Sequence, residues 1–155
     1  MIGNGEYMST FADPAARTSI RQRIEKLTPD TQRQWGRMTP HQMMCHLTDG
    51  YRMSLGERDP KPVHNVFTRT VVRRIALHTF MTWPKGVKTL PEADQERGGT
   101  KPVEWDRDRE ELLRKIEAFS AKEGHAHPIF GPLSADEWNV WGYRHADHHL
   151  RQFGL

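Results

Sequence analysis

Two helix-start motifs constrain the fold of this chain more than any other feature of its sequence. Residues 39–42 read TPHQ and residues 134–137 read SADE. In each motif a hydroxyl residue precedes Gln or Glu by three positions, the capping-box pattern that satisfies the first free N–H groups of a helix. Pro40 also suits the first helical position. The motifs predict helices from 40 to about 56 and from 135 to about 153.

Three further helices are predicted from apolar residues that recur with helical spacing. They run from 13 to about 27, from 65 to about 82, and from about 106 to 121. Between the last two, residues 83–104 contain six Gly or Pro residues and predict a long surface loop that could act as a lid. No segment alternates with the period of a strand, so we expect an all-α bundle. The residues expected to face inward on these three helices are Ile20, Ile24 and Leu27; Phe67, Val71, Ile75 and His78; and Leu112, Leu113, Ile116 and Phe119.

We expect one domain over residues 13–155, after a loose N-terminal segment over 1–12. No repeat, low-complexity tract or Gly/Ser linker divides the 155 residues, and a chain of this length can bury a sizeable core without disulfides. Cys45 is the only cysteine, which excludes an internal disulfide and favours a reducing, cytoplasmic location.

Charge and hydropathy exclude two classes of partner. The formal net charge is +3, far from the excess typical of nucleic-acid-binding proteins. No apolar run approaches the ~20 residues that span a bilayer, and the first ten residues lack the layout of a secretory signal. We therefore expect neither nucleic acid nor a membrane as partner, and leave a homodimer open.

The nine histidines are the most informative residues for function, because imidazole is the commonest metal ligand. On a helical wheel that starts at Ala135, His145 and His149 fall at about 280° and 320°, on the apolar face of the last helix. His148 falls at about 220°, on the boundary of that face. Burying two imidazoles costs about 1–3 kcal/mol apiece unless each finds a partner, and a shared metal ion would satisfy both.

A third ligand is expected from a facing helix. His46 lies on the flank of the apolar face of the 40–56 helix, and Gly50, one turn later, leaves space in front of its imidazole. His78 of the 65–82 helix is the competing candidate. His41 and Cys45 are predicted to point elsewhere, with Cys45 as an inert, semi-buried thiol.

The sequence around these histidines resembles the DinB-like (YfiT-like) metalloenzyme superfamily. The similarity covers residues 15 to 155 and is carried by residues 35–46 (WGRMTPHQMMCH) and 143–153 (YRHADHHLRQF). The stretches at 35–36 and 127–131 are similar to a branch known only as a domain of unknown function. The resemblance implies a DinB-like four-helix bundle with an extra short helix or long loop. It also implies a metal site of His46, His145 and His149, followed by Gln152; many relatives have Arg-Gly where this chain has Leu150-Arg151.

Three neutral imidazoles would hold a divalent ion, zinc or nickel, and leave a coordination position open for a small-molecule substrate. The resemblance implies hydrolysis or S-transfer that depends on a low-molecular-weight thiol. His148 is the candidate general base. Asp49 could orient a ligand imidazole, although its wheel position favours a solvated carboxylate, and Trp138 and Trp141 could wall an apolar pocket. The alternative is a non-catalytic helical module whose histidines hold a structural metal or none.

Overall fold

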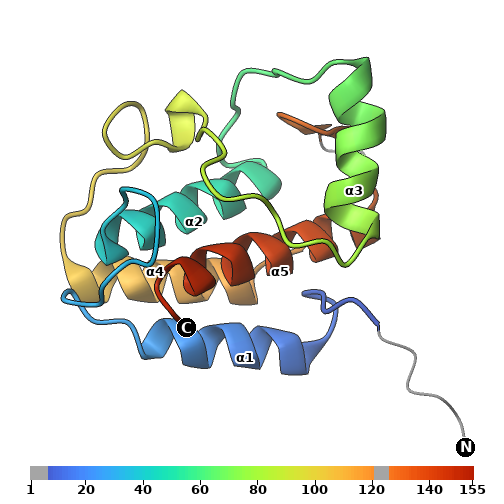
Figure 1. The fold of residues 1–155 in the computed structure, drawn as a ribbon. Coiled ribbons are helices and arrows are strands. Elements are labelled where there is room, and N and C mark those ends of the chain that lie inside the picture. Colours follow the sequence, from blue (N-terminus) through green and yellow to red (C-terminus); the bar gives the residue numbers. More distant parts are fainter. Residues whose placement is uncertain (1–6, 121–125) are drawn as a thin grey trace, which may run out of the picture.

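The computed structural model describes residues 7–120 and 126–155, and within them the fold is mainly helical (Figure 1). None of the helices in these ranges is long and apolar enough to cross a membrane. The elements are α1 (Pro14–Glu25), α2 (Pro40–Ser54), a π-helical turn (Thr68–Val72), α3 (Arg73–His78), a 3₁₀ turn (Pro91–Ala93), α4 (Trp105–Glu117), β1 (Ala126–His127), β2 (Gly131–Pro132) and α5 (Ala135–Gln152).

Side-chain caps begin the helices where the sequence predicts. Both capping boxes form: the Thr39 hydroxyl accepts from the N–H of Gln42, and the Ser134 hydroxyl accepts from the N–H of Glu137. Asp13 caps α1 in the same manner, with its carboxylate accepting from the N–H of Ala15. These caps fix the registers of α2 and α5, and the register decides which histidines face inward.

Four helices surround the core. α1 and α2 each pack against both α4 and α5, and Figure 1 shows the four running alongside one another while α3 stands across one end. The predicted inward faces of α1 and α4 are buried, apart from Leu113, which is half-buried. The two-residue strands β1 and β2 form an antiparallel hairpin that the sequence did not predict.

The prediction for residues 65–82 is wrong in two respects. The helical segment ends at His78, and its apolar side is exposed: Phe67 is 61% and Val71 44% accessible. Arg144 of α5 binds the main-chain carbonyls of Thr79 and Met81, which holds the chain extended after α3. Because α3 crosses the end of the other helices, Leu77 is its only fully buried residue, and Ala76 packs against the core while half-buried.

The loop over 83–104 is mostly exposed, as predicted, but its middle part folds onto α2. It contains the 3₁₀ turn, which contacts α2, and it buries Asp94 and Gln95. Of the predicted loose segment, residues 1–6 lie outside the described ranges. Phe11, within that segment, is fully buried and its N–H donates to the carbonyl of Asn139.

Candidate metal centre

Three histidines from two helices converge between α2 and α5. His46 lies in the middle of α2, and His145 and His149 lie one turn apart on α5. One ring nitrogen from each lies within 4.8 Å of the other two. The ring centroids are 4.6 Å apart for His46 and His149, 5.0 Å for His46 and His145, and 5.1 Å for the two α5 histidines. These are the three residues that the sequence nominates as ligands; the competing His78 hydrogen-bonds Glu137 instead.

Hydrogen bonds fix the tautomers of two of these imidazoles. Nδ1 of His46 lies 2.9 Å from the carbonyl oxygen of Ala93, which can only accept, so Nδ1 carries the proton. Nδ1 of His149 lies 2.9 Å from Oε1 of Gln152, whose amide nitrogen donates to the carbonyl of Trp35 at 2.9 Å. In both rings the lone pair is therefore on Nε2, the atom of His46 that faces His145.

His145 has a buried ring nitrogen without a hydrogen-bond partner in the part of the chain that the structure describes. Its Nε2 lies 3.0 Å from Nε2 of His46, while its buried Nδ1 finds no hydrogen-bond partner among the described residues. The ring packs against Trp141, with centroids 4.8 Å apart, and against Trp83 at 6.4 Å. The cluster therefore combines an unsatisfied nitrogen with an apolar wall.

Gly50 creates the space for His145. A Cβ atom at position 50 would lie 3.0 Å from Cε1 and 3.2 Å from Nδ1 of His145, and 3.3 Å from Trp141. From the sequence this space is expected in front of His46, on the same helix, but in the structure it holds the His145 imidazole of the facing helix.

Burial favours the neutral form of all three imidazoles. His46 and His145 are only 7% and 9% exposed, and His149 is the most exposed of the three. Loss of solvation lowers the pKa of each below its usual value, and the neighbouring imidazoles lower the pKa values of His145 and His149 further. Neutral imidazole is the form that ligates a metal.

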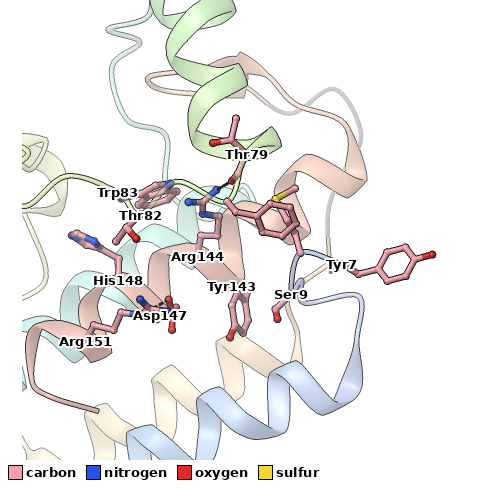
Figure 2. A pocket seen from close by; sticks show the side chains of 12 residues that line it. Tyr7, Ser9, Thr79, Thr82, Trp83, Tyr143, Arg144, Asp147, His148 and Arg151 are labelled. Atoms are coloured by element: carbon pink, nitrogen blue, oxygen red, sulfur yellow. Dashed lines mark hydrogen bonds and ion pairs between the residues drawn. The ribbon is translucent and has the colours of Figure 1, made fainter. Parts of the chain in front are cut away.

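His148 lies beside the cluster without joining it. Its ring centroid is 5.2 Å from that of His149 and 6.0 Å from that of Trp83, and burial lowers its pKa. Figure 2 shows it at one end of an open groove of about 500 Å³ on the outer side of α5. The groove is lined by Tyr7, Met8, Ser9, Thr79, Phe80, Thr82, Trp83, Tyr143, Arg144, Asp147, His148 and Arg151, which include none of the three clustered histidines.

Asp49 is a buried carboxylate, contrary to the favoured interpretation of its wheel position. It is fully buried, paired with Arg58 and 3.6 Å from Arg52. It also accepts from the N–H and hydroxyl of Thr100 at 2.7 and 2.6 Å, and from the Gln95 amide at 3.2 Å. The loop over 83–104 covers this face of α2, so Asp49 holds that loop in place and bonds none of the three imidazoles.

Cys45 points away from the three histidines, as predicted. It is 3% exposed, and burial together with the nearby Asp108 carboxylate raises its pKa to about 12.

Trp141 lies against His145, whereas Trp138 is packed in the core. Neither tryptophan lines the groove on α5.

Sequence reasoning missed three contributors to the centre. The carbonyl of Ala93 accepts from His46, and the carbonyl of Trp35 accepts from Gln152, which in turn orients His149. Every residue has a main-chain carbonyl, so the residue types do not reveal these contacts. Trp83, which packs against His145, precedes a proline in the long loop. An aromatic residue in a segment rich in Gly and Pro was the one available hint.

Comparison with known proteins identifies one family. The sequence pattern of the family described as protein of unknown function (DUF1569) matches residues 12–154, nearly the whole chain and all three clustered histidines. No curated protein and no solved structure gave a match. The chain belongs to the DUF1569 family of proteins of unknown function.

Proposed function

We propose that this protein is a metal-dependent enzyme of the DinB-like superfamily, acting on a small molecule by hydrolysis or by thiol-dependent S-transfer. His46, His145 and His149 would hold one divalent ion, zinc or nickel. One observation carries the proposal: three buried, neutral imidazoles from two helices converge, and outer hydrogen bonds leave Nε2 of His46 and of His149 as lone-pair donors.

The donor set fits such an ion. In tetrahedral zinc sites with Zn–N bonds of about 2.0–2.1 Å, neighbouring nitrogens are roughly 3.3 Å apart. Nε2 of His46 and Nε2 of His145 are already 3.0 Å apart. Without an ion, Nε2 of His145 donates its proton to Nε2 of His46. Nδ1 of His145 is then an acceptor with no donor among residues 7–120 and 126–155. A cation would give each of the three Nε2 lone pairs a partner once the His145 proton is on Nδ1 of that ring.

The superfamily assignment rests on the sequence resemblance and is supported by the helix arrangement. α1, α2, α4 and α5 pack in the pairwise pattern expected of a four-helix bundle, with α3 and the two short helical turns in the long segment between α2 and α4. The proposed ligands come from two helices that contact each other across this core.

Each neighbouring side chain has a part in the proposed chemistry. The ion, when bound, supplies a Lewis acid that lowers the pKa of a thiol or of water. His148 lines the groove, and burial lowers its pKa, which favours the neutral imidazole that a general base requires. Trp83 lies between the histidine cluster and the groove, because it packs against both His145 and His148. It limits the access of water to the cluster.

A structural metal site is the second candidate. It is favoured by the burial of His46 and His145 and by the absence of all three clustered histidines from the lining of the groove. In that case the ion would join α2 to α5 and carry no substrate.

Metal analysis of protein purified without a histidine tag tests the proposed ligand set. His149→Ala should lose about one equivalent of divalent ion per chain, because His46 and His145 alone cannot complete a tight site. His148→Ala, altered at the adjacent position of the same helix, should keep it. Full metal content in the His149→Ala protein would remove His149 from the ligand set.

Thiol access separates the enzyme from the structural site. The experiment uses cobalt-loaded protein in a Cys45→Ser background, which removes the chain's own thiol. An open position should admit a small thiol such as cysteine and give sulfur-to-cobalt charge-transfer absorption, and His145→Ala should give little. If several small thiols at millimolar concentration leave the cobalt spectrum unchanged, thiol-dependent transfer at this site fails.

A further inference from the structure

A second group of ligand-type side chains lies where α2 packs against α4. His41 and Cys45 are one turn apart on α2, and Asp108 projects from α4 towards them. One ligand atom from each residue lies within 4.8 Å of the other two. The three clustered histidines and the groove on α5 include none of these residues.

The separations are close to those of a metal site. Nε2 of His41 is 2.7 Å from Oδ2 of Asp108, and Sγ of Cys45 is 3.9 Å from the same oxygen. In a tetrahedral zinc site with bonds of about 2.3 Å to sulfur and 2.0–2.1 Å to nitrogen or oxygen, donor atoms are roughly 3.3–3.6 Å apart. Shifts of about half an ångström, within the reach of small side-chain rotations, convert one arrangement into the other.

The Asp108 carboxylate is held towards α2 independently of His41. It accepts from the main-chain N–H groups of Val103 and Glu104, at 2.9 and 3.3 Å, just before α4 begins. The side chains of His41 and Asp108 are 22% and 15% exposed, which gives an ion a path from solvent, whereas Cys45 lies beneath them at 3%. The group therefore has a fixed oxygen donor, an accessible edge and a buried sulfur.

We propose that His41, Cys45 and Asp108 form a second divalent-metal site, selective for zinc-like ions. On binding, the Cys45 thiol releases its proton to solvent and its sulfur becomes a thiolate ligand. The proton that Nε2 of His41 donates to Asp108 moves through solvent to Nδ1 of the same ring, so that the Nε2 lone pair and the carboxylate oxygen can both bind the ion. One thiolate and one carboxylate balance the two positive charges of the ion. A set of sulfur, nitrogen and oxygen donors favours Zn²⁺ or Co²⁺ over Mg²⁺ or Ca²⁺.

Cobalt titration of the wild-type protein, stripped of metal and kept reduced without added thiol, tests the site. Because Cys45 is the only cysteine, thiolate-to-cobalt charge-transfer absorption can come from no other residue of the chain. The band should appear and saturate at about one equivalent at this site, persist in His149→Ala, and vanish in Cys45→Ser. A wild-type sample shown by metal analysis to be saturated with cobalt, yet lacking the band, would overturn the proposal.

Two variants of α4 test the carboxylate ligand. Asp108→Asn should weaken the cobalt affinity reported by the band at least tenfold, because the amide cannot supply the negative charge. Asp106→Asn, at an exposed position in the first turn of the same helix, should leave it unchanged. Equal cobalt affinity in the wild-type and Asp108→Asn proteins would reduce the site to the thiol and overturn the three-residue assignment.

Discussion

At the scale of single residues, the orientation of His149 depends on one amide. Oε1 of Gln152 accepts from Nδ1 of His149, and the amide nitrogen is anchored on the carbonyl of Trp35. Gln152→Leu should therefore lower metal affinity about 10–100-fold, the usual effect of losing a partner of a ligating histidine. Gln152→Glu keeps the acceptor and should retain most of the affinity. Calorimetric titration with zinc measures both; equal loss in the two variants would mean that the bond from the amide nitrogen to Trp35, which both variants lack, controls the orientation of His149.

Two glycines on facing helices give opposite expectations for the same substitution. Gly50→Ala should lower metal affinity, because its Cβ would lie 3.0 Å from the His145 ring, while alanine's higher helix propensity limits any loss of stability. Gly142→Ala would place a Cβ 2.7 Å from Phe11 and 2.8 Å from Phe119, so it should cost about 1–3 kcal/mol of unfolding free energy without weakening the metal site. Zinc titration and denaturant unfolding of both variants test this contrast. If both variants lost stability and both kept the wild-type zinc affinity, the contrast would be contradicted.

The residues that the sequence identified at the centre share one property: a helical register set by a capping box. Thr39 and Ser134 fix α2 and α5, so the positions of His46, His145 and His149 follow from counting residues. The burial of Asp49 could not be predicted from its position along the helix. Its wheel angle indicates only that it faces away from the apolar side, and its burial depends on Arg58, just after α2, and on Thr100, which is far along the chain.

At the scale of elements, the start of α5 is held by charge as well as by its capping box. Glu137 accepts from Nε and Nη2 of Arg73 at 2.7 and 2.5 Å, from the main-chain N–H of Ser134 at 2.9 Å, and contacts His78. Burial alone would raise the pKa of Glu137, but these bonds lower it from 4.5 to about 2. The carboxylate thus links α3 to α5 only while it is ionised.

The stability that this link provides should therefore be lost in acid. Because the folded-state pKa is depressed, the contribution is fully present above about 4.5 and disappears as the pH falls towards about 2. Glu137→Gln preserves the capping box and removes the charge. We expect the wild-type protein to melt higher than this variant at about pH 6, and the difference to shrink by about pH 3. A constant difference across this range would assign the effect to packing.

α3 shows why element position is harder to predict than element type. Its apolar periodicity, with Phe67, Val71 and Ile75 on one side, is that of a core helix, yet this side faces solvent. Asn65 caps the segment as expected, accepting from the N–H of Thr68. Its direction is set instead by tertiary contacts at both ends, Glu137 with Arg73 and Arg144 with the carbonyl of Thr79, which no local pattern encodes. The hairpin of β1 and β2 is likewise too short for a periodicity to develop.

At the scale of the whole molecule, the histidine cluster joins parts of the chain that are far apart in sequence. His46 lies on α2 and is held by the loop through Ala93, and His149 is held by α5 and by the segment before α2 through Trp35. An ion bound only by the folded state adds its binding free energy to the stability of the whole fold. Metal binding should therefore behave as a global property of the chain.

Chelation tests this linkage, most cleanly in the Cys45→Ser background, where the three histidines are the relevant site. With metal at about 100 times its dissociation constant, linkage supplies about 2.7 kcal/mol. For a chain of this length that corresponds to a melting temperature about 5–10 °C higher with metal than without. His149→Ala in the same background should melt at one temperature in both conditions, because it lacks the site. Differential scanning calorimetry, with metal content measured before and after chelation, gives the comparison. An unchanged Cys45→Ser curve after complete metal removal would mean that the three imidazoles bind no ion that contributes to folding.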